Sequence, residues 1–129
     1  MTVQIILWTS IVLFALAAGG GLVMAGMRVS GDRNPPAWLA MLHGLLAAAG
    51  LTLLLFAAFT IGLPTYATWG LVLLVIAAVG GLYLNLGYQE RRVLLPKTVV
   101  YVHAAIAVVG FLLVLAGALA ANGTTVPTP

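Results

Sequence analysis

Residues 36–50 read PAWLAMLHGLLAAAG, and residues 96–110, sixty positions later, read PKTVVYVHAAIAVVG. Each segment begins with a proline, has a histidine seven positions on, and ends with a glycine seven positions after that. The two histidines, His43 and His103, are the only ones in the chain. Because both lie within long apolar runs, the pattern predicts two membrane-embedded copies of one helical unit, each carrying one imidazole.

Composition indicates an integral membrane protein. Of 129 residues, 64% are hydrophobic and 5% are charged, whereas a soluble domain needs far more charge to cover its surface. A transmembrane helix takes about 20 apolar residues, and four stretches meet that length. We therefore predict an all-α integral membrane protein, a four-transmembrane-helix bundle forming one domain over residues 1–129, with helices at 3–27, 37–61, 68–88 and 98–121.

The offset of sixty residues extends through most of the chain. Residues 8–61 align without a gap on residues 68–121, and the matches include the prolines, the histidines and a pair of glycines. Each half holds one helical hairpin, and both hairpins have the same orientation in the membrane. The expected architecture is two parallel repeats of a helical hairpin, related by an axis along the membrane normal.

The basic residues set the expected topology. They fall in two segments between the expected helices, 28–36 and 89–97, and they are Arg28, Arg33, Arg91, Arg92 and Lys97. The positive-inside rule places both segments in the cytoplasm and both termini outside, and the expected location is a bacterial inner membrane. Topology also accounts for the net charge of +3, so nucleic acid is not an expected partner.

The two histidines are expected to face each other at one depth. Each lies seven residues after its proline, so at 1.5 Å per residue both imidazoles are about 10 Å from the cytoplasmic end. A two-fold axis makes the second and fourth helices diagonal partners. Small residues at this depth, or on the same helix face as a histidine, are expected to open a flat slot: Gly20, Gly21, Gly80, Gly81, Ala47, Gly50, Ala107 and Gly110.

Two facing imidazoles in an apolar bundle favour a haem. Polar groups inside a membrane are costly and by default mark function, and histidine is the usual nitrogen ligand of haem iron. The sequence has no cysteine, which excludes thiolate metal sites, iron–sulfur clusters and covalently attached c-type haem. Both acidic residues, Asp32 and Glu90, fall in loops, which disfavours proton pumping. The prediction is one haem b per chain, its iron held by His43 and His103.

Other roles for the histidines stay open. They can hydrogen-bond across helices and only fix the packing, or they can bind copper, a quinone or a pigment. Copper is supported by Met24, Met27 and Met41, since thioether sulfur suits Cu(I). These methionines have no counterparts sixty positions away, and methionine in apolar helices is usually a gap filler.

Haem propionates are anionic and are expected to turn toward the nearer, cytoplasmic surface. Any of the five basic residues can pair with them, because the guanidinium group in particular matches a carboxylate. Arg92 and Lys97 are the candidates named from the sequence, although their role in topology explains them equally well.

In outline, the chain resembles the small transmembrane b-type cytochromes, four-helix bundles with haem ligated by histidines on separate helices. The resemblance covers all four expected helices and rests on the repeated Pro-(x6)-His-(x6)-Gly pattern. Di-haem members of that group use four histidines, so two histidines imply a single haem.

The resemblance implies an electron-transfer protein or accessory subunit rather than an enzyme. With two axial imidazoles the iron has no open position for oxygen chemistry. The expected partners are the lipid bilayer and either a quinone or a larger respiratory or photosynthetic complex. The alternative is a non-redox membrane subunit or small transporter, whose histidines pack helices or bind another metal or pigment.

Overall fold

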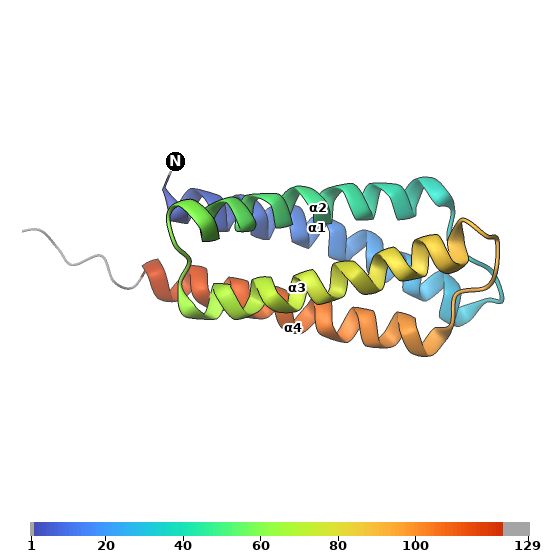
Figure 1. The fold of residues 1–129 in the computed structure, drawn as a ribbon. Helices are drawn as coiled ribbons and strands as arrows, with labels where there is room; N and C mark the ends of the chain where they lie inside the picture. The colour runs from blue at the N-terminus through green and yellow to red at the C-terminus, as the bar shows by residue number, and fades with distance from the viewer. Residues whose placement is uncertain (1, 123–129) are drawn as a thin grey trace, which may run out of the picture.

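The chain folds as a bundle of long helices that lie side by side (Figure 1). The structure, a computed structural model, describes residues 2–122. In chain order its elements are α1 (Val3–Ser30), α2 (Ala37–Thr60), α3 (Thr65–Leu84), the short π-helix η1 (Asn85–Gln89) and α4 (Lys97–Asn122). All four α-helices belong to segments long and apolar enough to cross a membrane.

The helices form two hairpins that pack against each other. α1 packs on α2 and α3 on α4, and the hairpins meet where α1 contacts α4 and α2 contacts α3. α2 and α4 therefore lie diagonally across the bundle, as the sequence predicts. The two basic segments lie together at one end, on the right in Figure 1. We call this end, residues 28–36 and 89–97, the basic end.

Prolines precede α2, α3 and α4, and a glycine follows the end of α2. Pro36 and Pro64 precede α2 and α3 with φ near −60° and an extended ψ. Proline fits there because its φ is fixed near the helical value and the first turn has no use for its missing N–H. Beyond α2, Gly62 has φ +93° and its N–H donates to the Ala57 carbonyl at 2.8 Å. This ending favours glycine, which adopts positive φ without strain.

The helix boundaries differ from the predicted ones in three places. α1 continues to Ser30, so Arg28 lies in its last turn and not in the following loop. A cation is stabilised there by the helix dipole. α3 begins at Thr65, three residues earlier than predicted, because Pro64 already starts the helix. At its other end α3 widens into the π-helix η1, where the Asn85 carbonyl accepts a hydrogen bond from the Glu90 N–H five residues on.

Close packing is concentrated away from the basic end. Buried apolar residues of all four helices meet there, with Phe14, Leu54 and Val114 among them. Glycine lets α3 and α4 approach closely, since a Cβ added to Gly70 would lie 2.7 Å from the Gly110 carbonyl oxygen. Small residues at helix contacts are typical of helices that associate in lipid.

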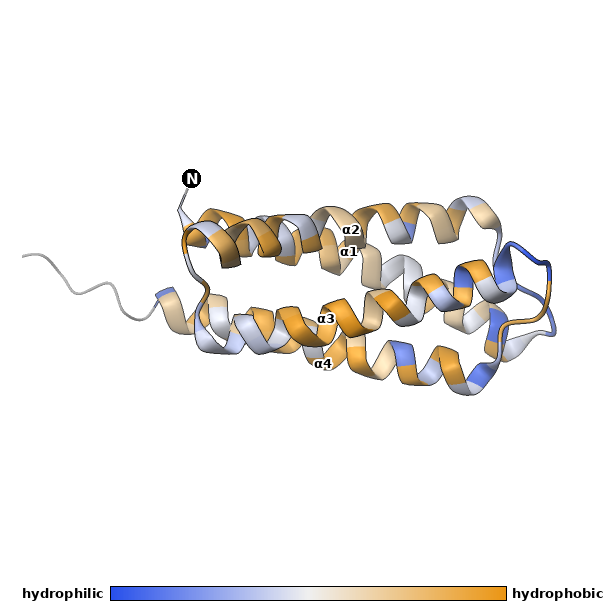
Figure 2. Ribbon diagram, in the orientation of Figure 1, coloured by the Kyte–Doolittle hydropathy of each residue, from blue (hydrophilic) through white to orange (hydrophobic). Residues whose placement is uncertain are grey.

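The outer surface is apolar along most of the bundle. Large side chains such as Leu22 and Phe59 are 69% and 86% exposed. Figure 2 shows hydrophobic residues along the length of the helices and hydrophilic ones gathered at the basic end. Soluble monomers rarely expose apolar patches larger than a few hundred Å², so this surface suggests a membrane protein.

Candidate functional site

The two histidines face each other between the hairpins. His43 comes from α2 and His103 from α4, and each lies six residues after the first residue of its helix. Their ring centres are 6.2 Å apart, with an angle of 73° between the ring planes. Two helices that are diagonal partners thus bring both imidazoles to one place at one depth.

A backbone carbonyl fixes the orientation of each ring. Nδ1 of His43 lies 2.7 Å from the Ala17 carbonyl oxygen, and Nδ1 of His103 lies 2.8 Å from that of Ala77. A carbonyl only accepts hydrogen bonds, so Nδ1 donates in both cases. In a neutral imidazole this leaves the lone pair on Nε2. Metal-ligating histidines use the same arrangement, in which one ring nitrogen is held by a carbonyl and the other is free to bind.

Glycines next to the two imidazoles make room for the rings. A Cβ added to Gly21, one turn after Ala17, would lie 3.0 Å from Cε1 of His43. A Cβ added to Gly81 would lie 3.2 Å from Cε1 of His103. Both distances are tighter than ordinary van der Waals contact, so a side chain at either position would push the imidazole away from its carbonyl.

A cavity of about 560 Å³ contains both histidines. Its volume lies within the range of about 300–1,000 Å³ typical of ligand pockets. Most of the lining residues form pairs sixty positions apart, so both hairpins contribute corresponding residues to the cavity. Small side chains make up much of the wall, including Ala17, Ala18, Ala47, Ala77, Ala78 and Ala107. Protein interiors are packed as densely as organic crystals, so an apolar space of this size is suited to a resident molecule.

One end of the cavity is polar. Arg28, Asn85, Gln89 and Glu90 line it near the basic end, and Asn85 and Gln89 are the first and last residues of η1. Arg28 is 8% exposed, while Glu90 is exposed to solvent. The two halves of the chain differ at this end of the cavity. Tyr88, sixty positions after Arg28, is not among the lining residues.

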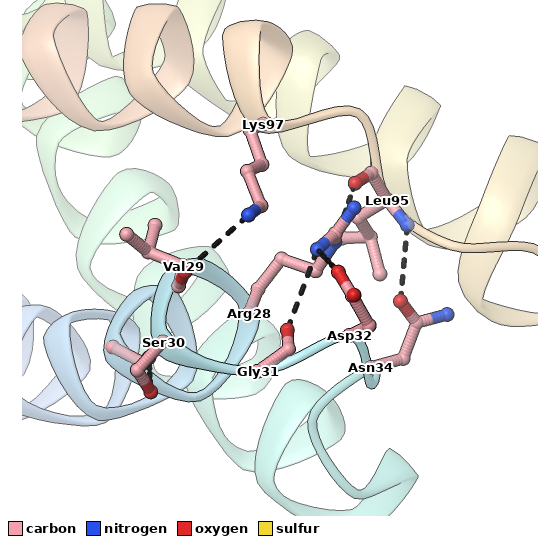
Figure 3. A network of polar contacts seen from close by, with 9 residues as sticks. Arg28, Val29, Ser30, Gly31, Asp32, Asn34, Leu95 and Lys97 are labelled. Carbon is pink, nitrogen blue, oxygen red and sulfur yellow. Dashed lines mark hydrogen bonds and ion pairs between the residues drawn. The ribbon is translucent and has the colours of Figure 1, made fainter.

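Hydrogen bonds between the two basic segments hold this end together (Figure 3). The Arg28 Nε donates to the Leu95 carbonyl at 2.7 Å, and the Leu95 N–H donates to Oδ1 of Asn34 at 3.0 Å. Asn34 in turn donates through Nδ2 to the Val93 carbonyl at 2.6 Å. Lys97 reaches the Val29 carbonyl at 3.4 Å through Nζ. The loop of one hairpin is therefore fixed to the loop of the other.

The structure brings together some of the small residues predicted for the slot and not others. Gly21, Gly81, Ala47 and Ala107 line the cavity with the two histidines, whereas Gly20, Gly50, Gly80 and Gly110 are not among its lining residues.

The excluded glycines lie in helix contacts or on the outer surface. A Cβ on Gly50 would lie 2.9 Å from the Phe14 ring, and one on Gly110 would lie 3.0 Å from Cγ of Leu74. Gly80 lies instead in a groove on the outside of α3 and α4, of about 420 Å³. Gly50 and Gly110 therefore serve helix packing, because the helix face seven positions after each histidine differs from the face four positions after it.

The basic residues at the cavity are also not the two that we named from the sequence. Arg92 is exposed in the loop with φ +56°, and Lys97 bonds the Val29 carbonyl; neither lines the cavity. Arg28 does, because α1 extends one turn further than expected. The carbonyls of Ala17 and Ala77 had been missed entirely, although the sixty-residue offset between these alanines was a visible signal.

His43 and His103 can supply two nitrogen ligands to a metal. Within residues 2–122 there is no group of three or more His, Cys, Asp or Glu side chains that could hold a metal ion. A bare zinc or copper ion typically needs three or four protein ligands, whereas a metal in a porphyrin is bound by the macrocycle and needs only two.

No family model, curated protein or solved structure matches this chain.

Proposed function

We propose that the chain spans a membrane as two parallel hairpin repeats and binds one haem b between His43 and His103, through which it passes single electrons. The observation that carries the proposal is the paired arrangement of the imidazoles. Each is tied through Nδ1 to a carbonyl of its own hairpin, with Nε2 left for a ligand, and both line one cavity between the hairpins.

The spacing of the rings supports a shared metal. With metal–nitrogen bonds of about 2.0–2.1 Å, as in zinc–imidazole sites, two imidazoles on opposite sides of one metal atom have ring centres roughly 6 Å apart. The observed separation is 6.2 Å. When bound, the haem would supply an iron that changes its charge by one electron, and His43 and His103 would hold it through Nε2.

The chain's own residues would fix the cofactor and exclude water. The carbonyls of Ala17 and Ala77 hold the proton on Nδ1 of each histidine and so keep Nε2 as the ligand atom. Alanines and glycines form the walls, and an apolar wall limits access of solvent to the iron. An iron held by both histidines would carry single electrons and would not activate oxygen. A quinone in the lipid, or a neighbouring subunit of a larger complex, is the proposed partner.

A packing role for the histidines is the second candidate. The same Nδ1 hydrogen bonds join α2 to α1 and α4 to α3, and interhelical hydrogen bonds of this kind stabilise membrane helices by about 0.6 kcal/mol on average. A packing histidine has no need of a cavity beside it, however, and dense side chains would serve it better.

Optical spectroscopy of the detergent-purified chain tests the proposal. We expect a dithionite-reduced minus oxidised spectrum with sharp b-type α and Soret bands, at one haem per chain by pyridine haemochrome. His43→Ala and His103→Ala should each abolish the low-spin spectrum. Leu42→Ala and Val102→Ala, at neighbouring positions outside the cavity, should leave it intact. A colourless protein after expression with ample haem would favour the packing role.

A further inference from the structure

The polar end of the cavity contains a buried cation that is already oriented. The side chain of Arg28 is 10% exposed, its Nε donates to the Leu95 carbonyl at 2.7 Å, and its Nη1 donates to the Gly31 carbonyl at 3.4 Å. The Leu95 carbonyl is itself held in place, because Asn34 accepts from the Leu95 N–H. Figure 3 shows the guanidinium between these two carbonyls. Its direction is thus set by the loops of both hairpins.

The charge of this guanidinium is weakly neutralised by the protein. Its nearest carboxylate, that of Asp32, lies 3.7 Å from Nη1 and has a side chain 88% exposed, and an ion pair with so exposed a partner contributes little. Glu90 also borders this end of the cavity, but it is exposed and screened by solvent. Among residues 2–122, the hydrogen bonds of Arg28 involve Nε and Nη1, which leaves Nη2 for a ligand.

An anion close to a buried cation offsets part of the cation's loss of hydration. Nη2 of Arg28 carries two donor hydrogens, and a hydrogen bond from a guanidinium to a carboxylate is a strong, charge-assisted one. Arg28 lines the same cavity as the two histidines, at its only strongly basic point among the described lining residues. An elongated ligand held by the imidazoles would therefore place an anionic group at this end.

We infer that Arg28 is the anchor for a carboxylate of the cavity ligand. The inference rests on the proposed haem, for which the carboxylate is a propionate, and it orients the propionate edge toward the basic end. Asn34 acts as a positioning residue, because it fixes the carbonyl that aims the guanidinium. Arg92 and Lys97 take no part in this contact.

The test is a comparison of two ligands in two proteins. The apo-protein in detergent is titrated with haem b and with haem b dimethyl ester, which keeps the macrocycle and iron but has no carboxylates. A charge-assisted hydrogen bond is worth about 1.5–3 kcal/mol, so we expect the intact chain to prefer the free acid by roughly 10- to 100-fold. In Arg28→Gln the ratio of the affinities for the free acid and the dimethyl ester should fall close to one. Arg33→Gln removes the same charge from an exposed position outside the cavity and should keep the preference.

The outcomes separate this inference from the haem proposal. If both ligands give low-spin spectra and Arg28→Gln keeps the full preference, Arg28 is not the anchor, whereas the haem site stands. A lipid phosphate bound at Arg28 would give that same unchanged preference. If the intact chain forms no low-spin haem complex, both ideas fail together. Should Arg28→Gln not fold, Arg28→Lys keeps the charge but loses the planar donor pair, and its preference must drop partway for the inference to survive.

Discussion

The contact between Gly21 and the His43 ring leads to a quantitative prediction for Gly21→Ala. The added Cβ would lie 3.0 Å from Cε1 and 3.3 Å from Nδ1 of His43, where the ring is held against the Ala17 carbonyl. Overpacking of this kind costs about 1–3 kcal/mol. Because the ring must move, its hydrogen bond to Ala17 and the direction of Nε2 are both disturbed.

Two other glycines of the same helix provide matched controls. A Cβ added to Gly19 or Gly26 meets nothing within 4 Å. Alanine is favoured over glycine in a helix by about 1 kcal/mol, and this gain is common to all three substitutions. The difference between Gly21→Ala and Gly19→Ala therefore isolates the clash with the histidine, at about 1–3 kcal/mol.

The assay is haem affinity together with denaturant unfolding in the same detergent. We expect Gly19→Ala and Gly26→Ala to unfold at equal or higher denaturant concentration than the parent chain, and Gly21→Ala to unfold earlier. Haem affinity should fall by about tenfold for each 1.4 kcal/mol by which the clash disfavours the ligating orientation of the imidazole. Gly81→Ala, whose closest contact is 3.2 Å, should show the same effect more weakly. If Gly21→Ala behaves like Gly19→Ala in both measurements, the imidazole is not held as we describe.

Three further predictions concern the bundle around the site. The double substitution Ala47→Leu and Ala107→Leu should fill part of the cavity. We expect the haem absorbance to be lost, while the helical circular dichroism and the stability of the apo-protein are kept. Haem binding at the parental affinity would show that these two alanines do not line the haem site. Gly70→Ala should destabilise the bundle by about 1–3 kcal/mol in denaturant titrations, because its Cβ would lie 2.7 Å from a backbone oxygen of α4. Asn34→Ala leaves the Leu95 N–H without its acceptor and should lower the free energy of unfolding by about 1–3 kcal/mol. Hydrogen exchange at the Leu95 amide should become faster. Unchanged exchange there would show that the loops are held by other contacts.

Much of the fold was predictable because it depends on quantities that the sequence states directly. The number of helices follows from apolar length, and proline marks where α2 and α4 begin. The facing of His43 and His103 follows from two helices with one direction and one register. None of these depends on the detailed shape of a side chain.

The role of each glycine was not predictable at the same level. Residues on the helix face of a histidine are expected to line one slot. At a rotation of 100° per residue, however, the seventh residue after the histidine lies at a different angle around the helix axis from the fourth. Gly50 thus meets Phe14 on α1, while Ala47 faces the cavity. Which face turns inward depends on how α2 rolls against its neighbours, and that is decided by the packing of all the helices.

The basic end was mispredicted for a different reason. Charge marked residues 28–36 as a loop, yet α1 carries Arg28 inside its last turn. Two carbonyls stabilise it there: that of Gly31, three residues further on, and that of Leu95, in the loop of the other hairpin. Hydropathy counts the cost of burying a guanidinium but contains no information on acceptors brought in by another loop.

The division of the site between the hairpins has a consequence for how such a site can arise. Each hairpin brings one imidazole, the carbonyl that orients it and a glycine packed against it, so a hairpin alone has half of the proposed site. On the proposed function, two copies of such a hairpin on separate chains would offer the same pair of imidazoles. Joining the halves in one chain allows them to differ, as they do at Arg28 and η1.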